Sequence, residues 1–508
     1  MRELFYLIEK QNSKVLMFFA LTSLLCGIEA FLHPILLKTI FDLGVIEKNF
    51  HWFTKLCLCY LALGLFLNLS TLKLNLWGKS LENKILHHVI RKVTLSYFSK
   101  DYLKILSKDD GYFIGRIYKD SFEGILPFLM TLRMLINHSI RLVIFIFILF
   151  HLSWKASLLL FAVVPIIIYF SNRFGEKIKI LAPKERENEA SFLGVLNKLI
   201  SSFKIIKTFG LLSPSLGEQD RKLWDFLNIN YQKYKVEQIY TTSADLGMNI
   251  SDFLTLFIGA LFVLRGELTF GGYLAFINTF WRTITGVMGF FKPIPQLKGY
   301  YTVIKRIYDF EKDRDERYYE EGKDIIMDKI NYAYNDGKVV FKDFSLKIKE
   351  GERIAIIGGN GSGKTTLALI LSGLLKPQQG KVVLPKNISS LTLPLMFPPI
   401  KIKDMIKNKI LAKKLRINGL EEDMPDDLSM GQKQKMGILM ALSKESDVYI
   451  FDEPLANIDE ESKKEIMKTI SETVKNKTLI AIMHGNEAYY NYFTRIINLD
   501  EIKGKSGS

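Results

Sequence analysis

Cysteine is scarce in this sequence, which has only three such residues among 508, namely Cys26, Cys57 and Cys59. All three fall in apolar stretches, and no histidine or further cysteine lies at a metal-ligating spacing from them. No disulfide framework or Cys/His metal site is therefore implied. We expect the three thiols to act as small hydrophobic side chains.

Charge is nearly absent from several long apolar stretches in the first 300 residues, among them 15–37, 142–168 and 254–264. Stretches of this kind suit the interior of a lipid bilayer. No small-residue cleavage site precedes a polar region near the first stretch, so we expect no removable signal peptide. The six expected membrane spans lie near residues 15–40, 53–77, 134–152, 156–171, 246–264 and 272–292.

The net charge of +16 is unevenly distributed along the chain. Residues 81–125 hold eight Lys and Arg and residues 172–245 hold twelve, whereas the short connections 152–155 and 265–267 hold one each. Basic residues collect on cytoplasmic loops of membrane proteins, so the excess indicates topology and no nucleic-acid partner is expected. The two long basic segments have a mixed helical pattern and predict helical hairpins in the cytoplasm.

A glycine-rich loop at residues 358–366 follows the apolar run 354–357 and precedes the apolar run 367–371. This order predicts a strand, a loop whose amides cradle phosphates, and a helix whose dipole favours an anion. Lys364 is spaced to reach the β and γ phosphates of a nucleotide, and Thr365 to hold Mg²⁺. The predicted ATP-binding residues of the loop are Gly358, Asn360, Gly361, Ser362, Gly363, Lys364, Thr365 and Thr366.

Two carboxylates follow a second apolar run, at Asp452 and Glu453 after residues 448–451. In a parallel sheet this strand would deliver both acids to the edge where the glycine loop lies. We expect Asp452 to hold Mg²⁺ and Glu453 to polarise the water that attacks the γ phosphate.

The segment Leu428–Gln432, Leu-Ser-Met-Gly-Gln, lies between these two motifs and ends 21 residues ahead of Glu453. It resembles the signature of ABC transporters, with Met430 where a glycine is usual, and the whole domain is similar to their nucleotide-binding domain. The resemblance implies that the signature of one subunit meets the γ phosphate held by another subunit, so that the protein is a homodimer or heterodimer. The signature residues are Ser429, Met430, Gly431 and Gln432.

Three further residues fall at positions of that family's motifs. His484 matches the switch histidine that contacts the γ phosphate. Asp459 matches the loop that crosses the dimer interface. Tyr334 matches the aromatic residue that stacks on adenine, with Tyr332 as an alternative.

The sequence departs from the family pattern at Leu393, where a glutamine that reaches Mg²⁺ is usual. No glutamine occurs between Gly380 and Gly431. Only 64 residues separate Thr365 from Ser429, so the helical subdomain is expected to be shortened.

The first 310 residues resemble the six-helix membrane domain of ABC exporters. The resemblance implies an all-α transmembrane domain at 1–310, a linker at 311–321, an α/β P-loop NTPase domain at 322–500 and a polar tail at 501–508. The loop tips near residues 105–113 and 200–209 are the expected contacts with nucleotide-binding domains.

We therefore expect an ATPase, with ATP and Mg²⁺ as cofactors, that exports a peptide, lipid or hydrophobic drug by alternating access. The expected location is the plasma (inner) membrane, with several spans and with the N-terminus and nucleotide domain in the cytoplasm. The alternative is a poorly hydrolysing or regulatory partner subunit, which Leu393 and Met430 suggest. Polar residues in spans are costly in lipid, and the four candidates for a substrate cavity are Glu29, His33, Asn278 and Arg282.

Overall fold

The computed structural model describes residues 2–161, 164–291, 293–313, 318–334, 337–484 and 487–501. It divides into two compact units that are each discontinuous in sequence. The helical unit combines Met1–Ile90 with Lys119–Tyr308, and the sheet unit combines Arg91–Tyr118 with Asp309–Ser508.

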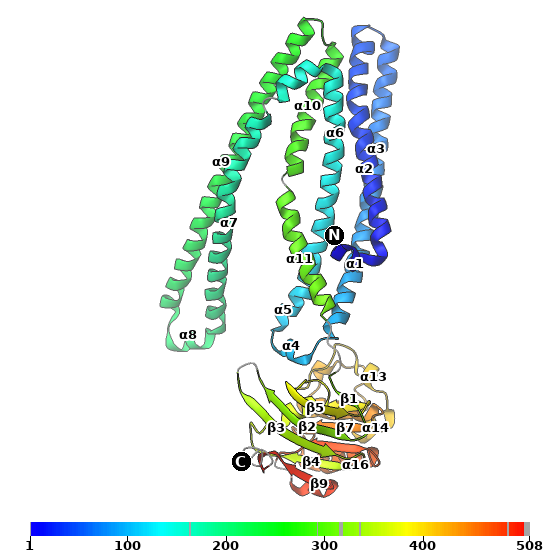
Figure 1. The fold of residues 1–508 in the computed structure, drawn as a ribbon, viewed down its shortest axis with the longest axis vertical. Coiled ribbons are helices and arrows are strands. Elements are labelled where there is room, and N and C mark those ends of the chain that lie inside the picture. Colours follow the sequence, from blue (N-terminus) through cyan, green and yellow to red (C-terminus); the bar gives the residue numbers. More distant parts are fainter. Residues whose placement is uncertain are drawn as a thin grey trace. The chain divides into compact units, whose positions relative to one another are not determined.

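The helical unit consists of long helices joined by short turns (Figure 1). Helices α7 and α9 run side by side and are joined by the short helix α8, as the predicted cytoplasmic hairpin requires. The elements that lie wholly or mainly in this unit are α1 (Arg2–Ile8), η1 (Glu9–Gln11), α2 (Asn12–Thr39), η2 (Ile40–Ile46), α3 (Phe50–Tyr97), η4 (Ser121–Ile125), α6 (Leu126–Phe161), α7 (Val164–Ser201), α8 (Phe203–Phe209), α9 (Leu212–Leu264), α10 (Phe270–Phe291) and α11 (Ile294–Lys312). The short helix η3 (Gly115–Lys119) lies mainly in the sheet unit.

Four helical runs of the described chain are long and apolar enough to cross a membrane: Arg2–Ile46, Phe50–Tyr97, Asp110–Leu159 and Leu212–Leu264. They contain the first, second, third and fifth expected spans. Helix α10 coincides with the expected sixth span except for residue 292, which lies outside the described residues. The expected span 156–171 includes residues 162 and 163, which also lie outside them.

The apolar stretch of α3 has no buried residue inside this single chain. Leu58, Leu65 and Leu72 on it are each more than half exposed. An apolar surface of this length requires lipid or another chain to cover it.

The N-terminal helix α1 packs one apolar face against the rest of the helical unit. Leu4, Leu7 and Ile8 are buried, and the Tyr301 hydroxyl donates a hydrogen bond of 3.0 Å to Glu3 Oε2. The Tyr6 ring meets that of Tyr308 edge-on, with centroids 5.3 Å apart. These contacts fix α1 to α11.

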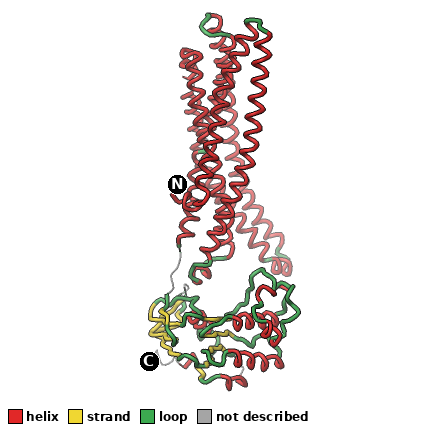
Figure 2. Tube along the Cα trace, turned by 90° about the vertical axis from the view of Figure 1, so that its right-hand side faces the viewer, coloured by secondary structure: helices red, strands yellow, loops and turns green. Residues whose placement is uncertain are grey.

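The sheet unit holds all the strands of the described chain, in two sheets (Figure 2). The first sheet has the order β1 (Glu320–Glu321), β5 (Gln379–Leu384), β2 (Ile325–Ala333) and β3 (Val339–Ile348). Strands β2 and β3 pair antiparallel as a hairpin. Gly337 in its turn has φ = 83°, a backbone conformation that favours glycine, whereas residues 335 and 336 lie outside the described residues.

The second sheet is entirely parallel, with the order β6 (Ile388–Leu391), β7 (Val448–Asp452), β8 (Thr478–Ile482), β4 (Arg353–Ile357) and β9 (Arg495–Asn498). Every residue of β7 and β8 is buried, which explains why these strands read as unbroken apolar runs. Helix α12 (Lys364–Leu371) packs in the core shared with the first sheet. The other face is covered by α13 (Ile402–Met405), α14 (Lys409–Lys414), α15 (Met430–Ser443) and α16 (Glu460–Thr473).

The boundaries of the sheet unit differ from the expected domain limits. Helix α11 continues to Lys312, and β1 at Glu320–Glu321 already pairs with β5, so both ends of the expected linker 311–321 belong to regular structure. The unit also contains α4 (Tyr102–Leu106) and α5 (Asp110–Ile114), which precede it by some 200 residues in sequence. Of the expected tail, residues 502–508 lie outside the described residues.

The Tyr332 side chain is only 1% exposed, and its hydroxyl has no hydrogen-bond partner among the described residues. Burial, with a smaller effect of Tyr334, raises the pKa of this phenol to about 12. Because an unsatisfied buried hydroxyl is unfavourable, Tyr332→Phe should raise the free energy of unfolding by about 1 kcal/mol, measured as an increased melting temperature of the purified protein. Tyr334→Phe, which removes a hydrogen bond of 2.9 Å to Thr366, is the matched control and should lower it; a destabilised Tyr332→Phe protein would contradict the prediction.

Candidate nucleotide site

The glycine loop has the strand, loop and helix context that the sequence predicts. It connects β4 to α12, which begins at Lys364. Gly358, Gly361 and Gly363 have φ values of 153°, 82° and 94°. A Cβ at Gly358 would lie 2.8 Å from Ser362 Oγ, so this turn requires glycine.

Lys364 is held against the loop that precedes it. Its side chain is largely buried, and Nζ donates hydrogen bonds of 2.8 Å to the carbonyl oxygens of Gly358 and Gly359. The ammonium group therefore lies at the mouth of the loop, where phosphate oxygens could replace carbonyl oxygens as acceptors.

Asp452, at the end of β7, is 2% exposed, and the Thr365 hydroxyl and the Leu393 amide lie beside it. Burial raises its pKa to about 6, the nearby Glu453 carboxylate adds to the increase, and these two polar groups oppose it. Thr365 and Asp452 thus place two oxygen donors together, which fits a small hard cation such as Mg²⁺. The described residues contain no cluster of three His, Cys, Asp or Glu, so further ligands would come from phosphate and water.

Glu453 and His484 line one small cavity of about 100 Å³, together with Pro454, Leu455, Ala456, Ile482 and Met483. They follow adjacent parallel strands, β7 and β8. Glu453 has φ = 48°, which is strained for a residue with a side chain. Two hydrogen bonds hold it there: its amide donates to Ile482 O at 3.1 Å, and its carbonyl accepts from Gln434 Nε2 at 3.0 Å.

The signature residues begin helix α15. Ser429 is its N-cap and forms a capping box with Gln432, in which each side chain accepts from the other's amide. Met430 is 65% exposed, so the residue that departs from the family pattern is accommodated within the chain. A Cβ at Gly431 would lie 3.0 Å from the Asn457 carbonyl oxygen, which brings the signature against the loop that contains Asp459.

Asp459 has a structural role inside the chain, because it caps α16 by accepting a hydrogen bond of 2.9 Å from the Ser462 amide. Tyr334 is partly exposed, whereas Tyr332 belongs to the core. Of the two tyrosines, only Tyr334 is accessible to adenine without unfolding of β2.

Two residues of the site carry no signal in the sequence motifs. Gln434 is 1% exposed and fixes the backbone of Glu453. Asp500 Oδ2 accepts a hydrogen bond of 2.7 Å from the Gly359 amide and so holds the start of the glycine loop. The spacing of Gln434 from the signature is visible in the sequence, but its partner is a backbone atom 19 residues away, which no side-chain pattern indicates.

The segment 98–118, which follows α3, is attached to the core of the sheet unit through α4. Tyr102 and Leu103 pack against the core between the two sheets. The Asp101 side chain caps α4 by accepting a hydrogen bond of 2.8 Å from the Leu103 amide. The contact lies next to the expected tip 105–113, slightly nearer the N-terminus.

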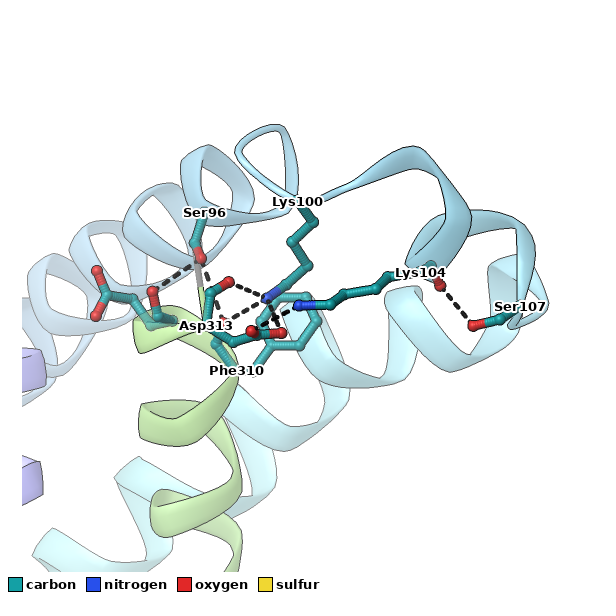
Figure 3. A network of polar contacts seen from close by, with 7 residues as sticks. Ser96, Lys100, Lys104, Ser107, Phe310 and Asp313 are labelled. Carbon is teal, nitrogen blue, oxygen red and sulfur yellow. Dashed lines mark hydrogen bonds and ion pairs between the residues drawn. The ribbon is translucent and has the colours of Figure 1, made fainter. Parts of the chain in front are cut away.

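A polar cluster joins the same segment to the end of α11, and we call it the linker clamp: Ser96, Lys100, Lys104, Phe310 and Asp313 (Figure 3). Lys100 Nζ donates to the carbonyl oxygens of Phe310 at 2.8 Å and Asp313 at 2.7 Å, and it lies 4.1 Å from the Phe310 ring centroid. Ser96 Oγ donates to Glu311 O at 3.0 Å. The clamp therefore supplies donors to the carbonyl end of α11, where they are electrostatically favoured.

Asp313 is the acidic member of the clamp. Its carboxylate pairs with Lys104 at 2.8 Å and with Lys100 at 3.3 Å. Hydrogen bonds from Lys104 and Lys100 lower the pKa of Asp313. The Lys100 side chain is 3% exposed, so this cation is largely removed from water and its partners matter for the local fold.

Three of the four candidate cavity residues meet in the helical unit. Arg282 contacts both Glu29 and His33, at 3.5 and 3.3 Å. Asn278 lies one turn earlier on α10. Arg141, which was not among the four, also pairs with Glu29, at 2.9 Å.

Comparison with known proteins gives two family matches. Residues 16–288 match the ABC transporter transmembrane region, and residues 341–456 match the ABC transporter family. The first match alone covers more than half of the chain.

Individual relatives are distant but extend across both halves. An uncharacterized ABC transporter ATP-binding protein of Bacillus subtilis (strain 168) is 23% identical over 66% of this chain and 65% of its own length. An ATP-dependent lipid A-core flippase of Syntrophus aciditrophicus (strain SB) is 23% identical over 78% of this chain and 72% of its own length. An ATP-dependent permease of Candida albicans is 25% identical over 66% of this chain and 56% of its own length.

The raised pKa of Asp452 makes a testable contribution to stability. A carboxyl group whose pKa is higher in the folded protein stabilises the fold only while protonated, so its unfavourable effect grows as the pH rises through about 6. Without nucleotide and Mg²⁺, Asp452→Asn should therefore have a free energy of unfolding at pH 7.5 that exceeds that of wild type by up to about 3 kcal/mol. This appears as a higher melting temperature, and the difference should shrink towards pH 5. Asp426→Asn, at an exposed position, should show no such trend; a difference independent of pH would contradict the assignment.

Proposed function

This chain is a member of the ABC transporter family and a multi-pass membrane protein, and we propose that it works as a dimeric, ATP-driven exporter of an amphipathic substrate. The observation that carries the proposal is the convergence of Thr365, Asp452, Glu453 and His484 at one edge of the parallel sheet. Ligand sites of open α/β sheets lie at this edge.

In this proposal the glycine loop and Lys364 bind the phosphates of ATP. Tyr334 stacks on adenine. Mg²⁺ accompanying the nucleotide would be held by Thr365 and Asp452 and would neutralise phosphate charge. Glu453 accepts a proton from the attacking water, and His484 donates to the γ phosphate from the adjacent strand.

A dimer is proposed because one chain supplies one phosphate loop and one signature. Ser429 and Gly431 would meet the γ phosphate bound by a partner subunit, with the N-terminus of α15 adding its dipole. Helix α8 would provide a second contact with a nucleotide-binding domain, since the Phe203 and Phe209 side chains on it are 64% and 71% exposed. ATP binding would join the two nucleotide domains and hydrolysis would release them, alternating the access of the membrane cavity.

The proposed orientation places the N-terminus, the hairpin α7–α9 and the nucleotide domain in the cytoplasm of the cell, because the basic residues concentrate there. The plasma (inner) membrane is the proposed location. Whether the partner is a second copy or a different half-transporter is decided by the turnover of the purified chain alone.

A second candidate function is a regulatory subunit that binds ATP and hydrolyses it poorly. It is favoured by Leu393, whose side chain has no group that could reach Mg²⁺. Against it stand the Glu453 carboxylate and His484, which line one cavity as hydrolysis requires.

ATP turnover by the purified protein distinguishes the two functions. Glu453→Gln should lower the turnover number by roughly 100-fold or more, because the glutamine cannot accept the proton of water. Leu393→Ala should change it little, because the contact of Leu393 with Asp452 is made by its backbone amide. Wild-type turnover no higher than that of Glu453→Gln would favour the regulatory subunit.

The linker clamp is the proposed route of coupling that replaces the missing glutamine. It ties the first cytoplasmic loop to α11 while Tyr102 and Leu103 contact the nucleotide core. A movement of the nucleotide domain would therefore be transmitted to α3 and α11, which continue into the helical unit.

Asp313→Asn tests this route, because it removes the charge that pairs with Lys100 and Lys104 while keeping the size of the side chain. ATP turnover should persist, whereas the ATP-dependent change in distance between the outer turns of two subunits should fall several-fold. That distance can be measured with spin labels at Arg265→Cys in a variant whose three native cysteines are replaced by alanine. Asp309→Asn is the control, because Asp309 is an exposed carboxylate on α11, one turn before Asp313. An unaltered distance change in Asp313→Asn would disprove the route.

A further inference from the structure

A cluster of charged side chains lies deep within the membrane-spanning helices of the helical unit. It joins α2, through Glu29 and His33, to α6, through Arg141, and to α10, through Arg282. Glu29 lies 17 residues before the end of its helical run at Ile46, which corresponds to roughly 25 Å at the rise of an α-helix. The cluster is therefore far from the outer ends of these helices.

The charges of this cluster do not balance. Glu29 Oε2 pairs with Arg141 Nη2 at 2.9 Å, and Glu29 Oε1 lies 3.5 Å from Arg282 Nη1. Both oxygens of the one carboxylate are thus engaged by two guanidinium groups. Glu29 is the only acidic partner of either arginine among the residues that the structure describes, so one positive charge is left over.

Two uncharged polar atoms beside the arginines, one on His33 and one on Asn278, have no hydrogen-bond partner among the described residues. The other ring nitrogen of His33, Nε2, lies 3.3 Å from Arg282 Nη2 and also contacts the Tyr60 hydroxyl. Since a guanidinium cannot accept a hydrogen bond, Nε2 must be the acceptor and the proton of the neutral imidazole lies on Nδ1. Nδ1 is buried and unpartnered, and so is Asn278 Oδ1, one helical turn from Arg282.

An unbalanced arginine in the middle of a span is costly in lipid, and such residues usually face a cavity or a binding site. The side chains are not sealed in the core: Arg141 and Arg282 are 39% and 31% exposed. A ligand can therefore reach both. Guanidinium groups bind carboxylate and phosphate oxygens in a bidentate manner, which makes an oxyanion the matching ligand.

We propose that Arg141 and Arg282, which both pair with Glu29, form the headgroup site for a transported amphipath whose headgroup is an oxyanion. The negative charge of the oxyanion balances the excess positive charge of the two arginines, and the His33 Nδ1–H adds one hydrogen-bond donor. The apolar tail lies along the apolar faces of the neighbouring helices. This inference rests on the proposed exporter function and names its substrate class.

Binding of lipid probes to the purified, nucleotide-free dimer in detergent tests the site. The probes are a fluorescent phosphatidic acid, a fluorescent fatty acid and a fluorescent phosphatidylcholine, which carry a phosphate, a carboxylate and a zwitterion. Wild type should bind one or both anionic probes at least tenfold more tightly than the zwitterion. The ratio between the two anionic probes then tells phosphate from carboxylate.

Three variants define the expected pattern. Arg141→Gln and Arg282→Gln should each weaken binding of the preferred anionic probe about tenfold and leave phosphatidylcholine unchanged. Glu29→Gln should strengthen it several-fold, because it frees both guanidinium groups, and this opposite sign separates ligand binding from a general loss of folding. Arg133→Gln is the matched control, since Arg133 lies on the same helix but stacks on the Phe18 ring at 5.1 Å.

Equal binding of the anionic and zwitterionic probes, or unaltered binding to both arginine variants, would overturn the headgroup site. Because the measurement uses no nucleotide, it is independent of ATP turnover. Specific anion binding by a protein that fails to hydrolyse ATP would support the headgroup site and count against the proposed exporter function. Normal ATP turnover without a preference for the anionic probes would support the exporter function and count against the headgroup site.

Discussion

Burial of the Asp452 carboxylate beside the Thr365 hydroxyl is the constraint on which the nucleotide site depends. Thr365 lies in the first turn of α12, which follows β4, and Asp452 ends β7; β8 lies between these two strands in the sheet. Burial is unfavourable for a carboxylate and raises the pKa of Asp452 to about 6. The same removal from water strengthens the attraction of the carboxylate for a cation.

Much of the nucleotide domain could be predicted from the sequence because its determinants are local. Buried parallel strands read as unbroken apolar runs, and the polar residue that ends each run must lie at the same edge. Asp452 and Glu453 end such a run, and the strand that precedes them is parallel to its neighbours, as that argument requires. Gln434 and Asp500 could not be predicted, since each acts on a backbone group distant in sequence and no pattern of residue types reports such a contact.

Less of the helical unit could be predicted from the sequence. Apolar length predicts where a span lies, but it does not tell which face of one helix meets which face of another. Glu29, His33 and Arg282 were recognised as costly in lipid, yet their convergence and the part played by Arg141 follow only from the packing of α2, α6 and α10. The place of α4 in the sheet unit could not be predicted for a related reason: Tyr102 and Leu103 pack against a core whose residues are distant in sequence.

The discontinuity of the sheet unit has a consequence for how the chain is made. Its first segment ends at Tyr118 and its second begins at Asp309, so some 190 residues of the helical unit are synthesised between them. Tyr102 and Leu103 can pack against the core of the two sheets only after the residues of the second segment have been synthesised. This packing is therefore a late event of high contact order. A fragment that begins at Asp309 would lack Tyr102 and Leu103, which pack against the core of the two sheets.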